Sequence, residues 1–280
     1  MVAFSVHAQE IVYGHRMVAI GITPVAQTAP GSPTNQDLEL QFARSGSSSW
    51  QTLSSATAVP GTRFTLSAPL TMSGLIRVID ATPGVTPVDQ AGVASSTAQR
   101  VVVRAALTLR QRAMDVLGGT AVVLHGRLHP GLRGRRVLLQ ARAGRGWLTL
   151  GSGRTASRGT FAVRYRAGSL GQQQLRIKFS GDRLNARVSA RAGSLSVYRQ
   201  SVASWYYDGG STACGFHAFY GVASRSLPCG AKVQFRMGSR KITAVVDDRG
   251  PYVGGRDWDF NQNTAGALGL LGVQTVWSTS

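Results

Sequence analysis

Three aspartates near the end of the chain could do acid–base chemistry. Asp247 and Asp248 follow the β-branched stretch Ile242–Val246, and Asp259 lies further along. Because side chains alternate along a strand, the adjacent carboxylates of Asp247 and Asp248 point to opposite faces. One can face a groove while the other caps the turn that follows. A carboxyl in a partly desolvated groove has a raised pKa, which lets it protonate a leaving oxygen near neutral pH.

Two interpretations of Asp259 remain open. Chemistry that uses two carboxylates needs a partner for Asp248 at a defined separation, and Asp259 is the candidate. The other interpretation is a buried structural aspartate that holds backbone amides. The sequence favours this structural role without excluding the catalytic one.

The composition favours a turn-rich β protein as the scaffold for these residues. Of the 280 residues, 43% are hydrophobic, which is typical of a globular chain, while only 15% are charged and 34 are glycine. No stretch approaches the roughly 18 uninterrupted apolar residues of a membrane-spanning helix, so we expect no such span.

The first 200 residues contain a weak internal repeat. Leu40–Gly46 precedes Trp50–Leu53, and the similar run Leu139–Gly144 precedes Trp147–Leu150. Each copy then passes through a glycine-containing turn into an alternating stretch and a further short strand. We interpret the single tryptophan of each copy as a plug in a hydrophobic core.

Short alternating runs between Gly, Pro and Ser predict antiparallel β-sandwiches. In the second copy, alternation places Phe161, Val163 and Tyr165 on one face. The predicted fold class is all-β, with two immunoglobulin-like sandwiches at residues 8–102 and 103–198. We expect a loop or linker from Pro83 to Gln99 and a third module at residues 201–280.

Nearly all of the net charge of +19 belongs to the second sandwich. Residues 101–200 contain 19 Lys and Arg against Asp115 and Asp182, whereas the flanking segments are close to neutral. Such a charge attracts a polyanion: nucleic acid, an anionic cell-wall polymer or a lipid surface. No aromatic residues interleave with the arginines of residues 133–145 as a base-stacking platform requires, so we predict no specific nucleic-acid binding.

From residue 201 onward aromatics, glycines and acids concentrate, and both cysteines appear. Three motifs stand out here: Leu227-Pro228-Cys229-Gly230, Asp248-Arg249-Gly250-Pro251-Tyr252 and Trp258-Asp259-Phe260. In this order and spacing they resemble the rare lipoprotein A (RlpA)-like double-psi β-barrel family, especially its secreted members with a paired cysteine. The resemblance covers about 80 of the 280 residues.

The resemblance implies a six-stranded double-psi barrel with a short helix near Thr264–Leu268. The family is related to expansins and to one class of lytic transglycosylases, and it acts on bacterial cell-wall glycan. Asp248 matches the acid proposed as catalytic in the family. It would protonate the leaving glycosidic oxygen and then help deprotonate the muramoyl 6-hydroxyl, whose intramolecular attack gives a 1,6-anhydro product.

The sequence departs from the family at one position. Lytic members carry a required histidine where this chain has Ser224, within Val222–Pro228. A serine hydroxyl can hydrogen-bond a sugar or orient Asp248, but it cannot act as a base near neutral pH. His217 could supply an imidazole by swinging into the groove, although an exposed loop residue is the simpler interpretation.

Aromatic side chains crowd around the motifs, and sugars pack their C–H faces on aromatic rings. Tyr206 and Tyr252 lie beside glycine and proline turns and are the preferred candidates for ligand contact, followed by Trp205. Arg249 is a further candidate substrate contact. Trp258 fits a core position equally well.

Cys214 and Cys229 are fifteen residues apart, and each precedes a glycine. Closing this loop would stabilise the fold by about 3 kcal/mol. A zinc site would need two more ligands and only His217 is at hand, so we predict a disulfide and no metal. A disulfide implies an oxidising, extracytoplasmic location.

The sequence therefore predicts a secreted, cell-wall-associated protein that acts on peptidoglycan glycan without a cofactor. The barrel cleaves glycan as a lytic transglycosylase or, alternatively, is a non-catalytic expansin-like carbohydrate-binding or adhesion module. The basic segment 101–199 would hold the protein against anionic cell-wall polymers. Ser5–Gln9 resembles the tail of a signal-peptide cleavage site, so we expect the start to lie inside a longer precursor.

Overall fold

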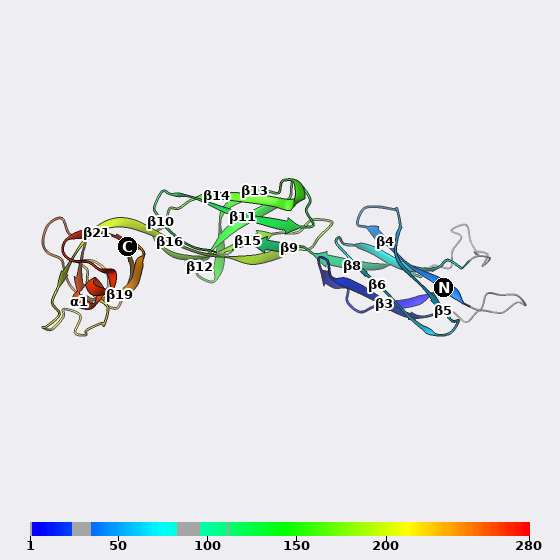
Figure 1. The fold of residues 1–280 in the computed structure, drawn as a ribbon, viewed down its shortest axis with the longest axis horizontal. Coiled ribbons are helices and arrows are strands. Elements are labelled where there is room, and N and C mark those ends of the chain that lie inside the picture. The colour runs from blue at the N-terminus through cyan, green and yellow to red at the C-terminus, as the bar shows by residue number, and fades with distance from the viewer. Residues whose placement is uncertain (1, 24–34, 83–95, 111) are drawn as a thin grey trace, which may run out of the picture.

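The structure is a computed structural model that describes residues 2–23, 35–82, 96–110 and 112–280. Apart from the short 3-10 turn Ser157–Gly159 and the helix α1 (Gln262–Leu268), the described secondary structure is β-strand. The strands surround three hydrophobic cores that follow one another along an elongated molecule (Figure 1). The predicted all-β class, with two sandwiches and a C-terminal barrel, is confirmed.

The first core lies between two sheets, β1-β3-β6 and β2-β8-β7-β4-β5. Their strands are β1 (Ala3–Val6), β2 (Glu10–Val12), β3 (Arg16–Ile22), β4 (Gln36–Arg44), β5 (Gln51–Ala58), β6 (Arg63–Pro69), β7 (Gly74–Asp80) and β8 (Gln99–Arg104). Alternation produces this sandwich, because every second residue of β6 faces the core and the residues between face solvent.

The second core lies between the sheet β14-β11-β9 and a larger sheet that contains β13-β12-β15-β16, with β10 paired to β16. The strands are β9 (Ala106–Leu109), β10 (Arg112–Leu117), β11 (Ala121–His129), β12 (Arg136–Ala143), β13 (Gly146–Arg154), β14 (Thr160–Arg166), β15 (Gly171–Phe179) and β16 (Val188–Tyr206). As predicted, Phe161 and Val163 are buried and Tyr165 packs against the same core.

The third unit is a closed barrel. The order β16-β20-β17-β19-β18-β21 returns to β16, so all six strands are paired on both sides. The remaining strands are β17 (Gly221–Ala223), β18 (Lys232–Met237), β19 (Arg240–Asp248), β20 (Trp258–Asn261) and β21 (Gln274–Ser278). Phe235 and Phe260 fill the interior with Trp258, which is a core residue.

One strand joins the second sandwich to the barrel. β16 is 19 residues long; its first half pairs with β15 and β10, and its second half pairs with β20 and β21. The strand passes from one unit to the next in Figure 1 without an intervening loop. The limits 8–102, 103–198 and 201–280 stay predictions; β1 precedes the first limit, and β16 runs through the last.

The expected linker from Pro83 to Gln99 lies for the most part outside the described residues. Its described end contacts the first sandwich, where the Ser96 N–H donates to Val78 O. The interpretation of the two tryptophans as core plugs is wrong. Trp50 and Trp147 are half-exposed and lie under the guanidinium groups of Arg77 and Arg176, at 4.2 and 4.0 Å.

Candidate active site

The barrel brings Asp248 and Asp259 to one level on its surface. Ala223 of β17 is paired with Asp248 of β19 on one side and with Asp259 of β20 on the other. Paired residues on neighbouring strands point to the same side of a sheet. The two carboxylates therefore flank the small Ala223 side chain, with backbones about 10 Å apart over two strand spacings.

A β-bulge at Asp247 produces this register between β17 and β19. Val222 is paired with Val246 but Ala223 is paired with Asp248, so Asp247 is the additional residue. Its side chain is fully buried, and Oδ2 accepts a hydrogen bond from the Ala218 N–H at 2.9 Å. Burial raises the pKa of Asp247. The adjacent carboxylates lie in different environments, Asp247 buried and Asp248 half-exposed, but the bulge interrupts the simple alternation predicted for them.

Asp248 is held by backbone groups. Its Oδ1 accepts hydrogen bonds from the Ala213 and Arg249 N–H groups, both at 2.8 Å. The second bond caps the turn after β19, and the first ties the loop before β17 to the carboxylate. Oδ2 receives no hydrogen bond from the described part of the chain, so this oxygen can face a ligand.

The surroundings of Asp259 favour the protonated form of its carboxyl. Burial raises the pKa of its carboxyl and the nearby charge of Asp248 adds to the effect, while Ser204 and Arg256 act in the opposite direction. Its Oδ1 accepts a hydrogen bond from the Ser204 hydroxyl at 2.7 Å. The role expected of a structural aspartate, holding a backbone amide, belongs to Asp257, whose Oδ2 accepts the Val202 N–H at 2.8 Å.

The hydroxyl of Tyr206 lies among these acids. It is buried and has no hydrogen-bond partner within the described residues. Burial raises its pKa strongly, and the carboxylates of Asp247, Asp248 and Asp208 raise it further. A buried donor without a partner carries a free-energy cost, which a ligand oxygen could remove.

An imidazole also lies at this end of the barrel. His217 Nδ1 is 2.9 Å from Asp208 Oδ1; the Asp208 side chain is 9% exposed and the His217 side chain 47% exposed. The Asp208 N–H in turn donates to Gln262 at the start of α1. Sequence reasoning treated His217 as an exposed loop residue and missed this pair, because Asp208 lies on a separate turn of the loop.

Ser224 and Arg249 hold the loop between β17 and β18. Ser224 is buried, and its hydroxyl accepts the Leu227 N–H at 3.1 Å; it meets Asp248 through its backbone N–H. The Arg249 guanidinium donates to the carbonyls of Ser224 and Leu227 and to Cys229 Sγ. These contacts are those of loop-supporting residues. The catalytic role expected of Ser224 and the substrate contact expected of Arg249 stay predictions.

The disulfide predicted between Cys214 and Cys229 is present. It joins the loop that carries Ala213 to the loop that Arg249 supports. Both loops border Asp248, so the crosslink fixes the surroundings of the carboxylate.

The loops and strand ends that carry the acids also carry exposed aromatic rings. Tyr252 is 81% exposed, Tyr207 80% and Trp205 43%. Phe219 is a further exposed ring that no sequence motif indicates. It is 71% exposed and packs edge-on against Tyr220. Rings of this kind, next to carboxylates, are typical of carbohydrate-binding surfaces.

Within the described residues, no group of three or more His, Cys, Asp or Glu side chains is arranged to hold a metal ion. None of the helices in the same residues is long and apolar enough to cross a bilayer.

The fold and the site define an all-β protein whose closed six-stranded barrel presents two carboxylates among exposed aromatics. No family model matches the chain. A curated protein of Aquifex aeolicus (strain VF5), described as probable endolytic peptidoglycan transglycosylase RlpA, is 37% identical over 83 residues, which cover 26% of this chain and 36% of that protein. The chain thus spans about a third of the length of the curated relative it matches, and the two are distant, partial relatives.

Solved structures of tandem modules are also similar. The fibronectin(III)-like modules of Clostridium thermocellum CbhA share 13% identity over 70% of this chain and 94% of theirs, with a TM-score of 0.25. An I-band fragment of titin shares 10% identity over 99% of this chain and 87% of its own, with a TM-score of 0.31.

Proposed function

We propose that the barrel cleaves the glycan strands of bacterial peptidoglycan as a lytic transglycosylase, in a protein located outside the cytoplasm. The register that sets Asp248 and Asp259 on either side of Ala223 carries the proposal. The partial similarity to a probable endolytic peptidoglycan transglycosylase and the disulfide support it.

The two carboxyls take complementary roles. Asp259, whose pKa is raised by burial, takes the step that the resemblance gives to Asp248 and donates its proton to the leaving glycosidic oxygen. The free Oδ2 of Asp248 accepts the proton of the muramoyl 6-hydroxyl. The bond from C1 to the leaving oxygen breaks as the bond from O6 to C1 forms, which gives the 1,6-anhydro product. Exchange with solvent then restores both carboxyls, and no water is consumed.

Other side chains bind the strand. The exposed rings of Trp205 and Tyr252 pack against sugar faces. The Tyr206 hydroxyl, which is buried, donates to a sugar oxygen once the side chains that cover it move aside. Arg256 lies near Asp259 and can contact an anionic or hydroxyl group of the substrate.

The decisive experiment is mass spectrometry of purified, peptide-stripped peptidoglycan after incubation with the full chain. We expect anhydro-muramoyl products from the unaltered protein and their loss in both Asp248→Asn and Asp259→Asn. Asp37→Asn, the same change in the first sandwich, is the matched control and should keep the products. Products that survive in Asp248→Asn would overturn the assignment.

One observation favours a second function, binding without cleavage. At the position of the family histidine, Ser224 is buried and its hydroxyl is bonded to Leu227 N–H. If no anhydro products form but the full chain still sediments with the stripped glycan, the barrel is an expansin-like binding module. Failure of both assays would favour an adhesion protein.

A further inference from the structure

The outer face of the large sheet of the second sandwich carries an uncompensated group of cations. β12, β15 and β16 turn their apolar side chains toward the core, and the residues between face outward. The outward cations, here called the basic face, are Arg142, Arg176, Lys178 and Arg191.

The basic face is costly for the folded protein. Arg176 lies directly opposite Arg191 on the neighbouring strand, and like charges in this position are destabilising. Burial lowers the pKa of Arg176, and the charge of Arg142 lowers it further. No carboxylate of the described residues lies within 4.0 Å of these four groups. A bound anion would remove the repulsion.

The guanidinium group of Arg176 is held in place. Arg176 lies 4.0 Å above the Trp147 ring and donates from Nε to Gln140 Oε1 at 2.9 Å, while Arg142 lies 5.5 Å from the same ring. Neither Arg142 nor Arg191 donates a hydrogen bond to another described residue. Their N–H groups therefore remain available beside the Arg176 guanidinium, and guanidinium forks match phosphate oxygens.

The first sandwich contains the same cluster of one arginine, one glutamine and one tryptophan. Arg77 donates to Gln41 at 3.0 Å and lies 4.2 Å above Trp50. The strand that carries Gln41 has a register shift just before it, as β12 has just before Gln140. The cluster is thus part of the repeated scaffold, and its tryptophan and arginine alone do not make a binding face.

The two copies differ in charge. Glu39, which accepts a hydrogen bond from Gln41 at 3.1 Å, corresponds to Leu138 in the second copy. By the same register, Ile79 corresponds to Lys178 and Ala43 to Arg142. On the same fold, the second sandwich therefore lacks the acid that lies beside the cluster and has two additional cations. This difference points to a function that the first sandwich lacks.

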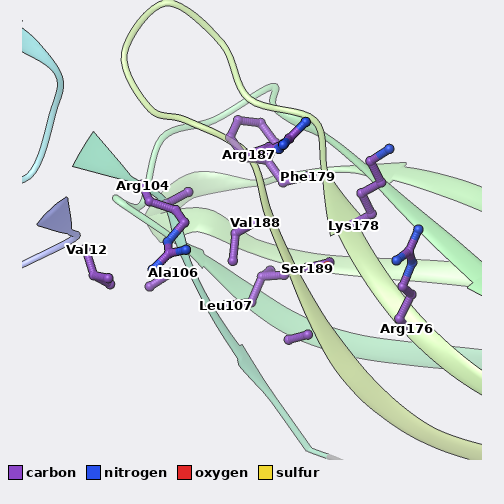
Figure 2. A pocket seen from close by; sticks show the side chains of 12 residues that line it. Val12, Arg104, Ala106, Leu107, Arg176, Lys178, Phe179, Arg187, Val188 and Ser189 are labelled. Carbon is purple, nitrogen blue, oxygen red and sulfur yellow. The ribbon is translucent and has the colours of Figure 1, made fainter. Parts of the chain in front are cut away.

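Two hollows extend the basic face. One, of about 610 Å³, includes Arg176 and Lys178, which follow one another along β15, together with Arg187 (Figure 2). The other, of about 330 Å³, is lined by Trp147, Arg191 and neighbouring polar side chains. Arg176 of the first hollow is paired with Arg191 of the second, so the two hollows are neighbours, and the cations along them are here called the cationic track.

We propose that this track binds a linear polyol-phosphate polymer, in which phosphodiesters link polyols that carry no base. A linear polyanion fits a track of cations one strand spacing apart. A nucleic acid would need a free aromatic platform, and Trp147 is already stacked with the protein's own guanidinium groups. The soluble polymer contains no glycan, so its binding can be measured whether or not the barrel cleaves glycan.

Titration of the full chain with poly(glycerol phosphate) over a salt series tests the proposal. The triple variant Arg142→Gln, Arg176→Gln, Arg191→Gln should bind at least about tenfold more weakly at low salt. Its log–log salt slope should fall by about 2, from three lost phosphate contacts. Arg77→Gln, which changes the equivalent arginine of the first sandwich, should leave both quantities unchanged.

Two further measurements serve as controls. Leu138→Glu, which restores the acid of the first copy, should weaken binding while every cation remains. The triple variant should unfold at a similar temperature, since the like-charge repulsion that it loses offsets the loss of the Arg176 ring contact and hydrogen bond. An unchanged salt slope in the triple variant would overturn the proposal. So would equal or tighter binding of single-stranded DNA of the same phosphate number, or of anionic lipid vesicles.

Discussion

At the scale of single residues, burial and neighbouring charge give similar side chains different tasks. Asp247, Asp248 and Asp259 are chemically identical, yet the first is fully buried, the second is held by two backbone N–H groups, and the third bonds a hydroxyl. Tyr206 lies near them, and its hydroxyl has no hydrogen-bond partner among the described residues. The arrangement concentrates both proton donors and proton acceptors at one end of the barrel.

The raised pKa of Asp259 predicts a pH dependence. A general acid works only while protonated, so cleavage should decline as pH rises through the pKa of Asp259, which burial places above the ordinary value for aspartate. The release rate of anhydro products, measured from pH 4 to 8, should show this descending limb. An Asp259→Glu variant with residual activity should move the limb; a limb at the same pH would assign it to another group.

Gly221 makes room for the buried Asp247. A Cβ at Gly221 would lie only 2.2 Å from Asp247 Oδ2. Gly221→Ala should therefore destabilise the barrel by about 1–3 kcal/mol, as overpacking does. Gly266 in α1 has open space around it, and Gly266→Ala should stabilise the helix by up to about 1 kcal/mol. Urea denaturation of the two variants checks the opposite signs.

Local sequence revealed some of these residues and concealed others. That one of Asp247 and Asp248 is buried while the other is half-exposed could be predicted, because neighbouring side chains of a strand face different ways. The pairing of Ala223 with Asp248 and Asp259 depends on three strands and a bulge, for which the sequence has no local signal. The proximity of His217 to Asp208 likewise depends on how the loop before β17 folds back on itself.

At the scale of elements, the loops around Asp248 depend on one crosslink. Removing the bridge with Cys214→Ala and Cys229→Ala, or reducing it, should lower the free energy of unfolding of the barrel by about 3 kcal/mol, as expected for a loop of fifteen residues. The loss should show in the barrel only, since the chain has 2 cysteines and both lie there. Hydrogen exchange with and without reductant would resolve this. Increased exchange in the sandwiches would contradict it.

The repeat shows how far a pattern of residues determines an element. Alternation correctly predicted the faces of residues 160–165, because burial of every second side chain is what defines a sandwich strand. It did not predict the environment of Trp50 and Trp147. Their half-exposed positions follow from the register of the outer strands and from arginines on β7 and β15, far away in the sequence.

At the scale of the whole molecule, the second sandwich and the barrel share a strand and a set of contacts. Asp115 of β10 accepts hydrogen bonds from Lys241 of the barrel at 3.2 Å, and Arg236 lies 3.5 Å away. Tyr198 is fully buried beside Trp277. The sequence indicated a change of composition at residue 201, but a strand that continues through such a change leaves no trace in composition.

The shared strand predicts that a barrel cut at residue 201 is unstable. Such a fragment lacks Arg199, which donates to Ser280 O at 2.7 Å and pairs with Asp257 at 3.2 Å, and it loses part of the pairing with β21. We expect residues 201–280 to be at least about 3 kcal/mol less stable than the barrel within residues 105–280. Arg199→Ala and Asp115→Ala in the longer fragment should each account for a part of the loss. Equal denaturation midpoints for the two fragments would contradict this expectation and show that the barrel folds independently of the sandwich.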